Sequence, residues 1–447
     1  LLLCNRSVNP VFPVSTSFQN IRGTFDILPD AYTDDGGTRI ASSAEWRHVE
    51  ATVRDVMRRH NFEEIRTPIL EPTELVARGV GESTDIVQKE MFAFERKDTQ
   101  YVLRPEITAP VVRSFLQHHL DQRGGVQKLF YLGPCFRAEK PQKGRYRQFH
   151  QFGIEILGAD EARADAETIA VLMAICEALG LSDLDLRLNT LGTPDRRAEY
   201  VEALRGYLEP YADELSDTSR RRLERNPLRI LDTKVEHEQK LLRDAPQLID
   251  FVGDESLAHY DEVKGLLDDL GLEYEEDPHL VRGLDYYTET TFELEHPGLG
   301  AQSALAGGGR YDRLAEVLGS DAPVPAVGFA AGIERVFLAL DAADVDRPGT
   351  PTPDVFIAAL GEEAEQWVFR TSQELRAAGL HVAHDLKGRS LKAQMKEANR
   401  QNAPYALIIG GNELEAEAAT VKEMQSGEQQ EVPFADLPEY LASRVEP

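Results

Sequence analysis

Cysteine is scarce in this chain of 447 residues, which contains only Cys4, Cys135 and Cys176. Three widely separated cysteines argue against a disulfide framework and against the paired spacing of a zinc site. No apolar run approaches the roughly 18 residues of a membrane span, and the opening LLLC lacks the basic lead and the apolar core of an export signal. These absences predict a cytoplasmic globular protein with no membrane association and no metal held by dedicated protein ligands.

Positive charge is also in short supply. The chain has 49 Lys and Arg against 77 Asp and Glu, a formal net charge of −28 and a pI near 4.8. This balance disfavours a nucleic-acid partner, because phosphate binding requires clustered Lys and Arg. Two stretches depart from it, since residues 137–147 and 387–400 each contain five basic residues and one acid. Phosphate-binding functions are therefore predicted at these two places.

Lysine is the rarer of the two basic residue types. Only twelve of the 49 are Lys. An acidic composition that favours Arg over Lys is typical of a protein kept soluble in concentrated salt, and an ordinary acidic cytosolic protein is the alternative.

Periodicity predicts a large first domain that mixes helices and strands. Trp46, Val49, Val53 and Val56 lie at spacings of three and four and form one apolar stripe, which predicts a helix over 43–60. A strand follows over 62–72, ended by Pro72, in a position that suits a sheet edge or a dimer interface. Strands over 126–136 and 145–157, joined by a basic turn, predict an antiparallel hairpin.

Charged helical segments interrupt this pattern from about 195 to 262, which predicts a helical insertion, and strand character resumes at 272–275. Beyond a polar, Pro-rich stretch, apolar strands alternate with amphipathic helices, as in a small α/β domain. The fold class is therefore α+β followed by α/β. The predicted domains are an N-terminal extension over 1–20, a catalytic domain over 21–345, a linker over 346–353 and the α/β domain over 354–447.

The second strand of the hairpin has two unlike faces. The core face is predicted to carry Phe152, Ile154 and Ile156, and the other face Phe149, Gln151, Gly153 and Glu155. An aromatic, an amide, a carboxylate and a gap suit the floor of a ligand site, although a solvent-exposed polar face is the alternative for this strand alone. Arg137 and the basic turn bring positive charge to the same hairpin, and a guanidinium grips phosphate oxygens while staying charged. The hairpin is therefore predicted to be the active site of an ATP-using enzyme.

At this point a resemblance becomes specific. The string FRAEKPQKGRYRQFHQFGIEILG resembles motif 2 of histidyl-tRNA synthetases nearly residue for residue, and AEWRHVEATVRDVMRRHNFEEIRTPILEP resembles their dimer-forming motif 1. LVRGLDYYT and LAGGGRYD resemble the two histidine-specific segments, GFAAGIERV resembles motif 3, and GRSLKAQMKEANRQNAPYALIIGGNE resembles part of the anticodon-binding domain. The resemblance runs from residue 21 to the C-terminus and implies a class II synthetase antiparallel sheet flanked by helices. Together with the acidic composition, it predicts a source in a halophilic archaeon.

The family's activity is implied with the fold. Such a ligase is a homodimer that activates L-histidine with ATP and Mg²⁺, releases pyrophosphate, and transfers the acyl group to the 3′ end of tRNA(His). No covalent enzyme intermediate is needed, so catalysis would rest on positioning and electrostatics.

The matching motifs carry roles over to individual residues. The implied catalytic residues are Arg137, Arg282 and Arg335. The implied ATP-binding residues are Arg137, Glu139, Arg145, Phe149 and Arg335. The implied histidine-binding residues are Glu106, Ile107, Thr108, Arg137, Gln151, Glu155, Arg282, Tyr286, Tyr287 and Tyr311. Glu155 and Tyr287 would meet the two imidazole nitrogens, which point apart and need a partner each. Ile107 stands where many members of the family carry Gly.

Two further patterns have plainer alternatives. Lys392, Lys396 and Arg400 recur every four residues and form one helical face, which would lie near the tRNA backbone; a solvated surface stripe is the alternative. The Gly run over 307–309 predicts a turn when taken alone, and it lacks the spacing of a nucleotide-binding loop.

Three other proteins would share part of this pattern. The regulatory subunit of ATP phosphoribosyltransferase has the catalytic fold but typically lacks the anticodon domain, which is present here. A class II synthetase for proline, threonine or glycine would not need LVRGLDYYT together with Glu155. A plain RNA-binding protein would not need a strand face that forms the floor of an ATP site.

Overall fold

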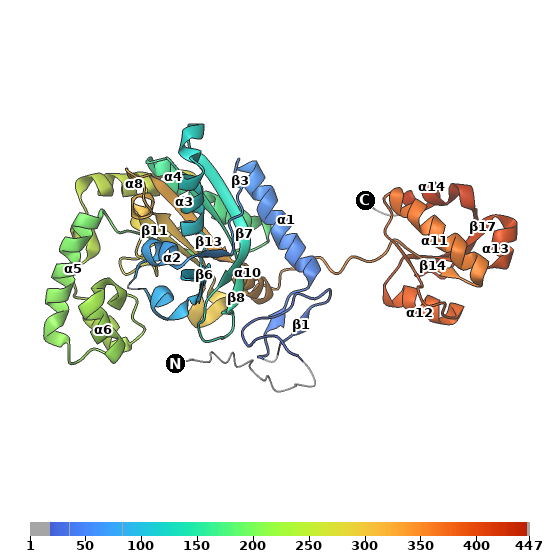
Figure 1. Ribbon diagram of the computed structural model, residues 1–447, viewed down its shortest axis with the longest axis horizontal. Helices are drawn as coiled ribbons and strands as arrows, with labels where there is room; N and C mark the ends of the chain where they lie inside the picture. Colours follow the sequence, from blue (N-terminus) through green and yellow to red (C-terminus); the bar gives the residue numbers. More distant parts are fainter. Residues whose placement is uncertain (1–17, 35, 83, 445–447) are drawn as a thin grey trace, which may run out of the picture. The chain divides into compact units, whose positions relative to one another are not determined.

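The computed structural model describes residues 18–34, 36–82 and 84–444 (Figure 1). The chain divides into two compact units, with the boundary between Pro348 and Gly349. Each unit has its own apolar core. No helix within the described residues is long and apolar enough to cross a membrane.

An eight-stranded sheet forms the centre of the first unit, in the order β10-β9-β11-β12-β13-β8-β7-β3. Its strands are β3 (Glu63–Glu64), β7 (Gln127–Phe136), β8 (Gln148–Leu157), β9 (Asp185–Thr190), β10 (Glu275–Glu276), β11 (Thr288–Glu295), β12 (Ala304–Arg310) and β13 (Ala326–Gly332). Neighbouring strands are antiparallel except at the two edges, where β10 pairs with β9 and β3 with β7 in parallel. Strands β7 and β8 form the predicted hairpin.

Helices cover one face of this sheet and bury its largest apolar core (Figure 1). They are α1 (Ser43–Arg59), α4 (Ala162–Ala178), α8 (Asp254–Asp269) and α10 (Ile333–Ala342). Ser42 and Glu45 begin α1 with a capping box, in which each side chain accepts from the backbone N–H of the other residue. Trp46 and Val49 of α1 pack against Phe152 and Ile154 of β8 in the same core. The predicted core face of β8 is therefore confirmed.

The opposite face of the sheet meets the rest of the first unit. There lie α2 (Thr73–Val80), α3 (Thr108–Gln117), α9 (Leu314–Val317) and the insertion helices α5 (Pro194–Leu208), α6 (Asp217–Arg225) and α7 (Glu236–Leu242). A three-stranded sheet is formed by β4 (Leu70–Pro72), β6 (Thr99–Leu103) and β5 (Phe92–Arg96), and a small pair by β1 (Tyr32–Thr33) and β2 (Arg39–Ile40). Figure 1 shows α5 and α6 standing out at one side of the unit.

Three local predictions were wrong. The strand expected over 62–72 is split into β3 and β4, which join different sheets; Pro68 lies between them and cannot donate a ladder hydrogen bond. The strand expected over 272–275 is only the pair Glu275–Glu276. The Gly run over 307–309 is not a turn but the middle of β12.

A five-stranded sheet forms the second unit, in the order β15-β14-β16-β17-β18. Its strands are β14 (Val355–Ala359), β15 (Val382–His384), β16 (Tyr405–Ile409), β17 (Ala418–Glu423) and β18 (Gln429–Pro433), and its helices are α11 (Glu362–Ala377), α12 (Leu391–Arg400), α13 (Gly411–Ala416) and α14 (Leu437–Ala442). Strands β15, β14 and β16 are parallel with helices between them. The predicted fold class, α+β followed by a small α/β domain, is confirmed.

Candidate active site

A cavity of about 420 Å³ opens above the ligand face of β8. Phe149 and Gln151 of β8 line it, together with Ala306 and Gly307 of β12 and Ala330 of β13. A second cavity of about 650 Å³ adjoins it, extends to the insertion, and shares Arg137, Arg145 and Arg282 with it. The floor of the first cavity is thus made of three neighbouring strands, β12, β13 and β8, and β8 is the strand that the sequence predicted for it.

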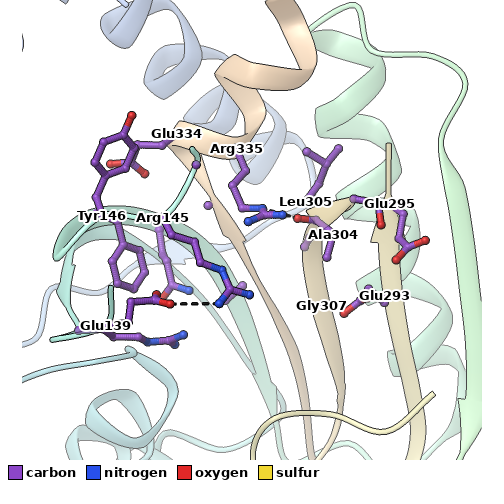
Figure 2. A pocket seen from close by; sticks show the side chains of 18 of the residues that line it. Glu139, Arg145, Tyr146, Glu293, Glu295, Ala304, Leu305, Gly307, Glu334 and Arg335 are labelled. Carbon is purple, nitrogen blue, oxygen red and sulfur yellow. Dashed lines mark hydrogen bonds and ion pairs between the residues drawn. The ribbon is translucent and has the colours of Figure 1, made fainter. Parts of the chain in front are cut away.

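Four arginines reach the first cavity from different elements. Arg137 follows β7; its Nε donates to Pro105 O at 3.0 Å, and its guanidinium lies 5.2 Å from the centre of the Phe149 ring. Figure 2 shows Arg145 donating to Glu139 (3.1 Å) across the hairpin turn, and Arg335 donating to the Ala304 carbonyl (2.5 Å) from the opposite side.

The fourth arginine, Arg282, is paired with Glu293 of β11. Its guanidinium occupies the space above Gly307, where an added Cβ would stand 1.7 Å from Nη2. The glycine run of β12 therefore leaves room for this side chain.

Glu155 lies at the buried end of the ligand face. It is 1% exposed, its Oε2 accepts a hydrogen bond from the Tyr311 hydroxyl, and its Oε1 has no partner among the described residues. Burial raises the pKa of Glu155 to about 8, although the bond from Tyr311 acts in the opposite direction. A buried polar atom without a partner is costly, so this oxygen marks a position where a donor from a ligand fits.

Aromatic and acidic side chains surround Glu155. The Tyr286 ring lies 4.7 Å from that of Tyr287 and 5.5 Å from that of Tyr311. Nearby, the Glu106 carboxylate accepts from the backbone N–H groups of Thr108 (2.7 Å) and Ala109 (3.0 Å) at the start of α3. Burial raises the pKa of Glu106 as well. The arrangement is a buried polar pocket beside a cavity lined by arginines.

The family model described as "Histidyl-tRNA synthetase" matches residues 39–336. The chain belongs to the histidyl-tRNA synthetase family. A second model, "Anticodon binding domain", matches residues 354–444, in the second unit.

Relatives extend the similarity over nearly the whole chain. The histidine–tRNA ligase of Chloroherpeton thalassium is 47% identical over 423 residues, covering 94% of this chain and 96% of the relative. The histidine–tRNA ligase of Thermotoga maritima is 48% identical over 429 residues, covering 96% and 99%. The solved structure of apo S. aureus histidyl-tRNA synthetase superimposes with a TM-score of 0.79 at 38% identity, covering 95% of this chain and 100% of that one.

A more distant structure shows the fold alone. It is described as an ATP phosphoribosyltransferase regulatory subunit/histidyl-tRNA synthetase from Bacillus halodurans, at 23% identity and a TM-score of 0.62. The relatives named above are bacterial, so the predicted archaeal source is not supported.

The structure brings most of the predicted residues of the first unit together around the first cavity and the pocket of Glu155. Lining the first cavity are Arg137, Glu139, Arg145, Phe149, Gln151, Arg282 and Arg335. Buried in or beside the pocket of Glu155 are Glu106, Thr108, Tyr286, Tyr287 and Tyr311. Ile107 packs in the apolar core on that side of the sheet and does not line the cavity. Lys392, Lys396 and Arg400 lie in the second unit, exposed along α12.

Sequence reasoning missed several residues of the site. Tyr131 stands opposite Gly153 in the hairpin register, and an added Cβ at Gly153 would lie 2.4 Å from the Tyr131 hydroxyl. The Cys135 thiol donates to Gln151 Oε1 at 3.2 Å. Glu334 accepts from the backbone N–H of His150 at 2.9 Å. Tyr131 and Cys135 lie four residues apart on β7, so strand alternation puts them on one face, and their pairing with Gly153 and Phe149 makes it the ligand face.

Proposed function

We propose that this chain is a histidine–tRNA ligase, which joins L-histidine to ATP to form histidyl-adenylate and then transfers the acyl group to tRNA(His). The single observation that carries the proposal is the buried carboxyl of Glu155 with one unpartnered oxygen, placed next to a cavity lined by four arginines. Membership of the family and identities of 47–48% over nearly the whole chain support it.

The histidine end of the site would be the pocket of Glu155. Imidazole presents two ring nitrogens that point apart, and Glu155 and the Tyr287 hydroxyl would each take one. Glu106, Thr108 and Gln151 would receive the α-ammonium group. An amino acid without an imidazole would leave Glu155 buried and unpaired, and sites of this kind reject such analogues by about 10⁴–10⁵. Tyr286 and Tyr311 would line the pocket.

The ATP end would be the arginine-lined cavity. Arg137 and Arg282 would hold the α-phosphate and the carboxylate of histidine, Arg145 would meet the distal phosphates, and the adenine would lie between Phe149 and Arg335. Charge that develops on the α-phosphate would be stabilised by donors already in place, at about 2.7–4 kcal/mol each by analogy with oxyanion-hole deletions. ATP would bring Mg²⁺ on its phosphates, with Glu139 in the same cavity.

The remaining parts of the proposal concern the whole molecule. The region over 21–345 would be the catalytic domain and the region over 354–447 the anticodon-binding domain, with α12 near the tRNA backbone. The enzyme would act in the cytoplasm as a homodimer that uses β4 and α1, in the segment resembling motif 1. A net charge of −28 would keep it soluble in concentrated salt.

One assay tests the proposal directly. ATP–pyrophosphate exchange is measured with Mg²⁺ and each of the twenty amino acids, at low and at molar salt, and histidine alone should support it. Glu155→Ala should lower kcat/KM for histidine by about 100-fold or more, because a hydrogen bond to the buried carboxyl is lost and the Tyr311 hydroxyl is left unpaired.

The matched control is Glu177→Ala, which removes an exposed carboxylate of α4 outside both cavities. Its exchange rate should equal that of the wild type. Exchange that depends on another amino acid, or a Glu155→Ala enzyme as active as the control, would contradict the assignment.

A further inference from the structure

The segment over 280–287 carries three of the side chains proposed to bind histidine, Arg282, Tyr286 and Tyr287. It forms neither a helix nor a strand. No ladder of backbone hydrogen bonds therefore fixes its shape, and its conformation depends on individual contacts with other parts of the fold. We call residues 280–287 the recognition segment.

The helical insertion supplies charged donors to this segment. Arg197 of α5 donates through Nη1 to the carbonyl oxygen of Tyr287 at 2.5 Å. Arg229, in the turn after α6, donates through Nη2 to the carbonyl oxygen of Gly283 at 2.5 Å. Asn226 adds a longer contact from Nδ2 to Asp285 Oδ1 at 3.4 Å. The two arginines thus hold the recognition segment at its middle and at its end.

Both arginines are built into the insertion rather than extended over its surface. Each is half-buried, and burial lowers the pKa of Arg197 and of Arg229. Arg222 of α6 donates to the Arg229 carbonyl at 2.8 Å, which fixes the turn that carries this side chain. Burying a cation costs free energy unless it makes strong hydrogen bonds. Arg197 and Arg229 make such bonds to carbonyl oxygens of the recognition segment.

The rest of the fold holds the backbone of the segment by neutral contacts, and the Arg282 side chain of the segment pairs with Glu293 of β11. Asn189 of β9 donates to the Leu280 carbonyl at 3.1 Å, and the backbone N–H of Asp285 donates to the Val80 carbonyl at 3.1 Å. Hydrogen bonds from a charged donor are roughly twice as strong as neutral ones. The insertion therefore provides the stronger hydrogen bonds to the backbone of the segment.

We propose that the helical insertion positions the recognition segment for histidine through Arg197 and Arg229, so that these two arginines are positioning residues for amino-acid recognition. This inference rests on the proposed function. Neither side chain needs to touch histidine: each holds a carbonyl of the segment, while Arg282, Tyr286 and Tyr287 extend from the same backbone. Loss of either arginine should weaken the binding of histidine, for which the segment supplies three side chains, far more than that of ATP, which Arg137, Arg145 and Arg335 would hold from other parts of the fold.

The test uses the full-length chain and Arg197, because Arg197 lines neither cavity. Arg197→Met keeps an unbranched apolar stem in place of that of arginine and removes the donors, whereas Arg197→Lys keeps a charge and an N–H donor on a slightly shorter side chain. In ATP–pyrophosphate exchange, Arg197→Met should raise KM for histidine by about tenfold or more, with KM for ATP changed less than about twofold. Arg197→Lys should recover part of the loss.

The matched control is Arg196→Met. Arg196 precedes Arg197 on α5, is exposed, and pairs with Glu199 of its own helix at 3.2 Å. Its loss should leave both KM values at the wild-type level.

A second readout separates positioning from stability. Hydrogen–deuterium exchange of the peptide that contains the recognition segment should be faster in Arg197→Met than in the wild type, and saturating histidine should restore its protection. If Arg197→Met does not stay folded, Arg229→Met carries the same two measurements.

Three results would overturn the inference: equal rises in KM for histidine and ATP, an unchanged KM for histidine in a folded variant, or unchanged hydrogen–deuterium exchange of the recognition segment. A wild-type enzyme that shows no histidine-dependent ATP–pyrophosphate exchange would refute the proposed function instead, so the two failures can be told apart.

Discussion

Replacing Glu155 by Gln should remove part of the pH dependence of the free energy of unfolding of the first unit. The carboxyl is completely buried, and its pKa rises from 4.5 to about 8 on folding. At 1.36 kcal/mol per pKa unit, keeping this group in the fold costs up to about 5 kcal/mol once it is ionised in the unfolded chain. Gln has the same shape and no ionisation, so the cost should vanish in the variant.

The sign of the effect follows from which state releases its proton first. Below pH 4.5 the group is protonated in both states, and its contribution to stability is fully present. Between pH 4.5 and about 8 the unfolded chain loses the proton while the folded chain keeps it, so the wild type loses stability as the pH rises. The free energy of unfolding of Glu155→Gln, relative to the wild type, should therefore rise by several kcal/mol between pH 5 and 8.5.

Tryptophan fluorescence during urea unfolding can follow the first unit alone. The chain contains two tryptophans, Trp46 in the core beneath β8 and Trp367 in the second unit. In a Trp367→Phe background, Trp46 reports the unit that contains Glu155. Glu199→Gln, an exposed substitution on α5, serves as the control and should follow the wild-type curve. Parallel pH profiles for the wild type and Glu155→Gln would refute the reasoning about the buried carboxyl.

Two further predictions concern other parts of the molecule. Gly307→Ala should displace the Arg282 guanidinium, because the new Cβ would stand 1.7 Å from Nη2, and should lower histidine-dependent exchange by about 100-fold; Gly206→Ala on α5, which has nothing within 4 Å, should have no effect. Neutralising the three basic residues of the α12 stripe should weaken tRNA binding and reduce its salt slope by up to about three, while pyrophosphate exchange stays constant; equal losses in both reactions would contradict the separation of roles.

Local periodicity was enough to predict the parts of the fold that depend on one element. The alternation of β8 predicted Phe152 and Ile154 on the core side, and both are buried there. The spacing of Trp46 and Val49 predicted the buried stripe of α1. In each case the period of the backbone alone decides which side chains share a face.

Prediction failed where a distant segment decides the local structure. The glycines over 307–309 have turn propensity, yet β11 and β13 pair with them on both sides and make them a strand. The partner of Tyr287 at Arg197 lies 90 residues away, and no local pattern links the two. A single sequence shows which side chains share a face of an element, but it does not show which distant residue folding brings into contact with them.

Because β8 has a core face and a ligand face, the same packing that stabilises the fold also keeps the strand in its correct register. A slip of one residue in its register would turn Phe152, Ile154 and Ile156 into the cavity and bury Glu155 among apolar side chains. Exposing three such side chains would cost about 1.5–3 kcal/mol each, before the cost of a misplaced carboxyl is counted. The hydrophobic core beneath the strand therefore fixes which side chains of β8 face the cavity.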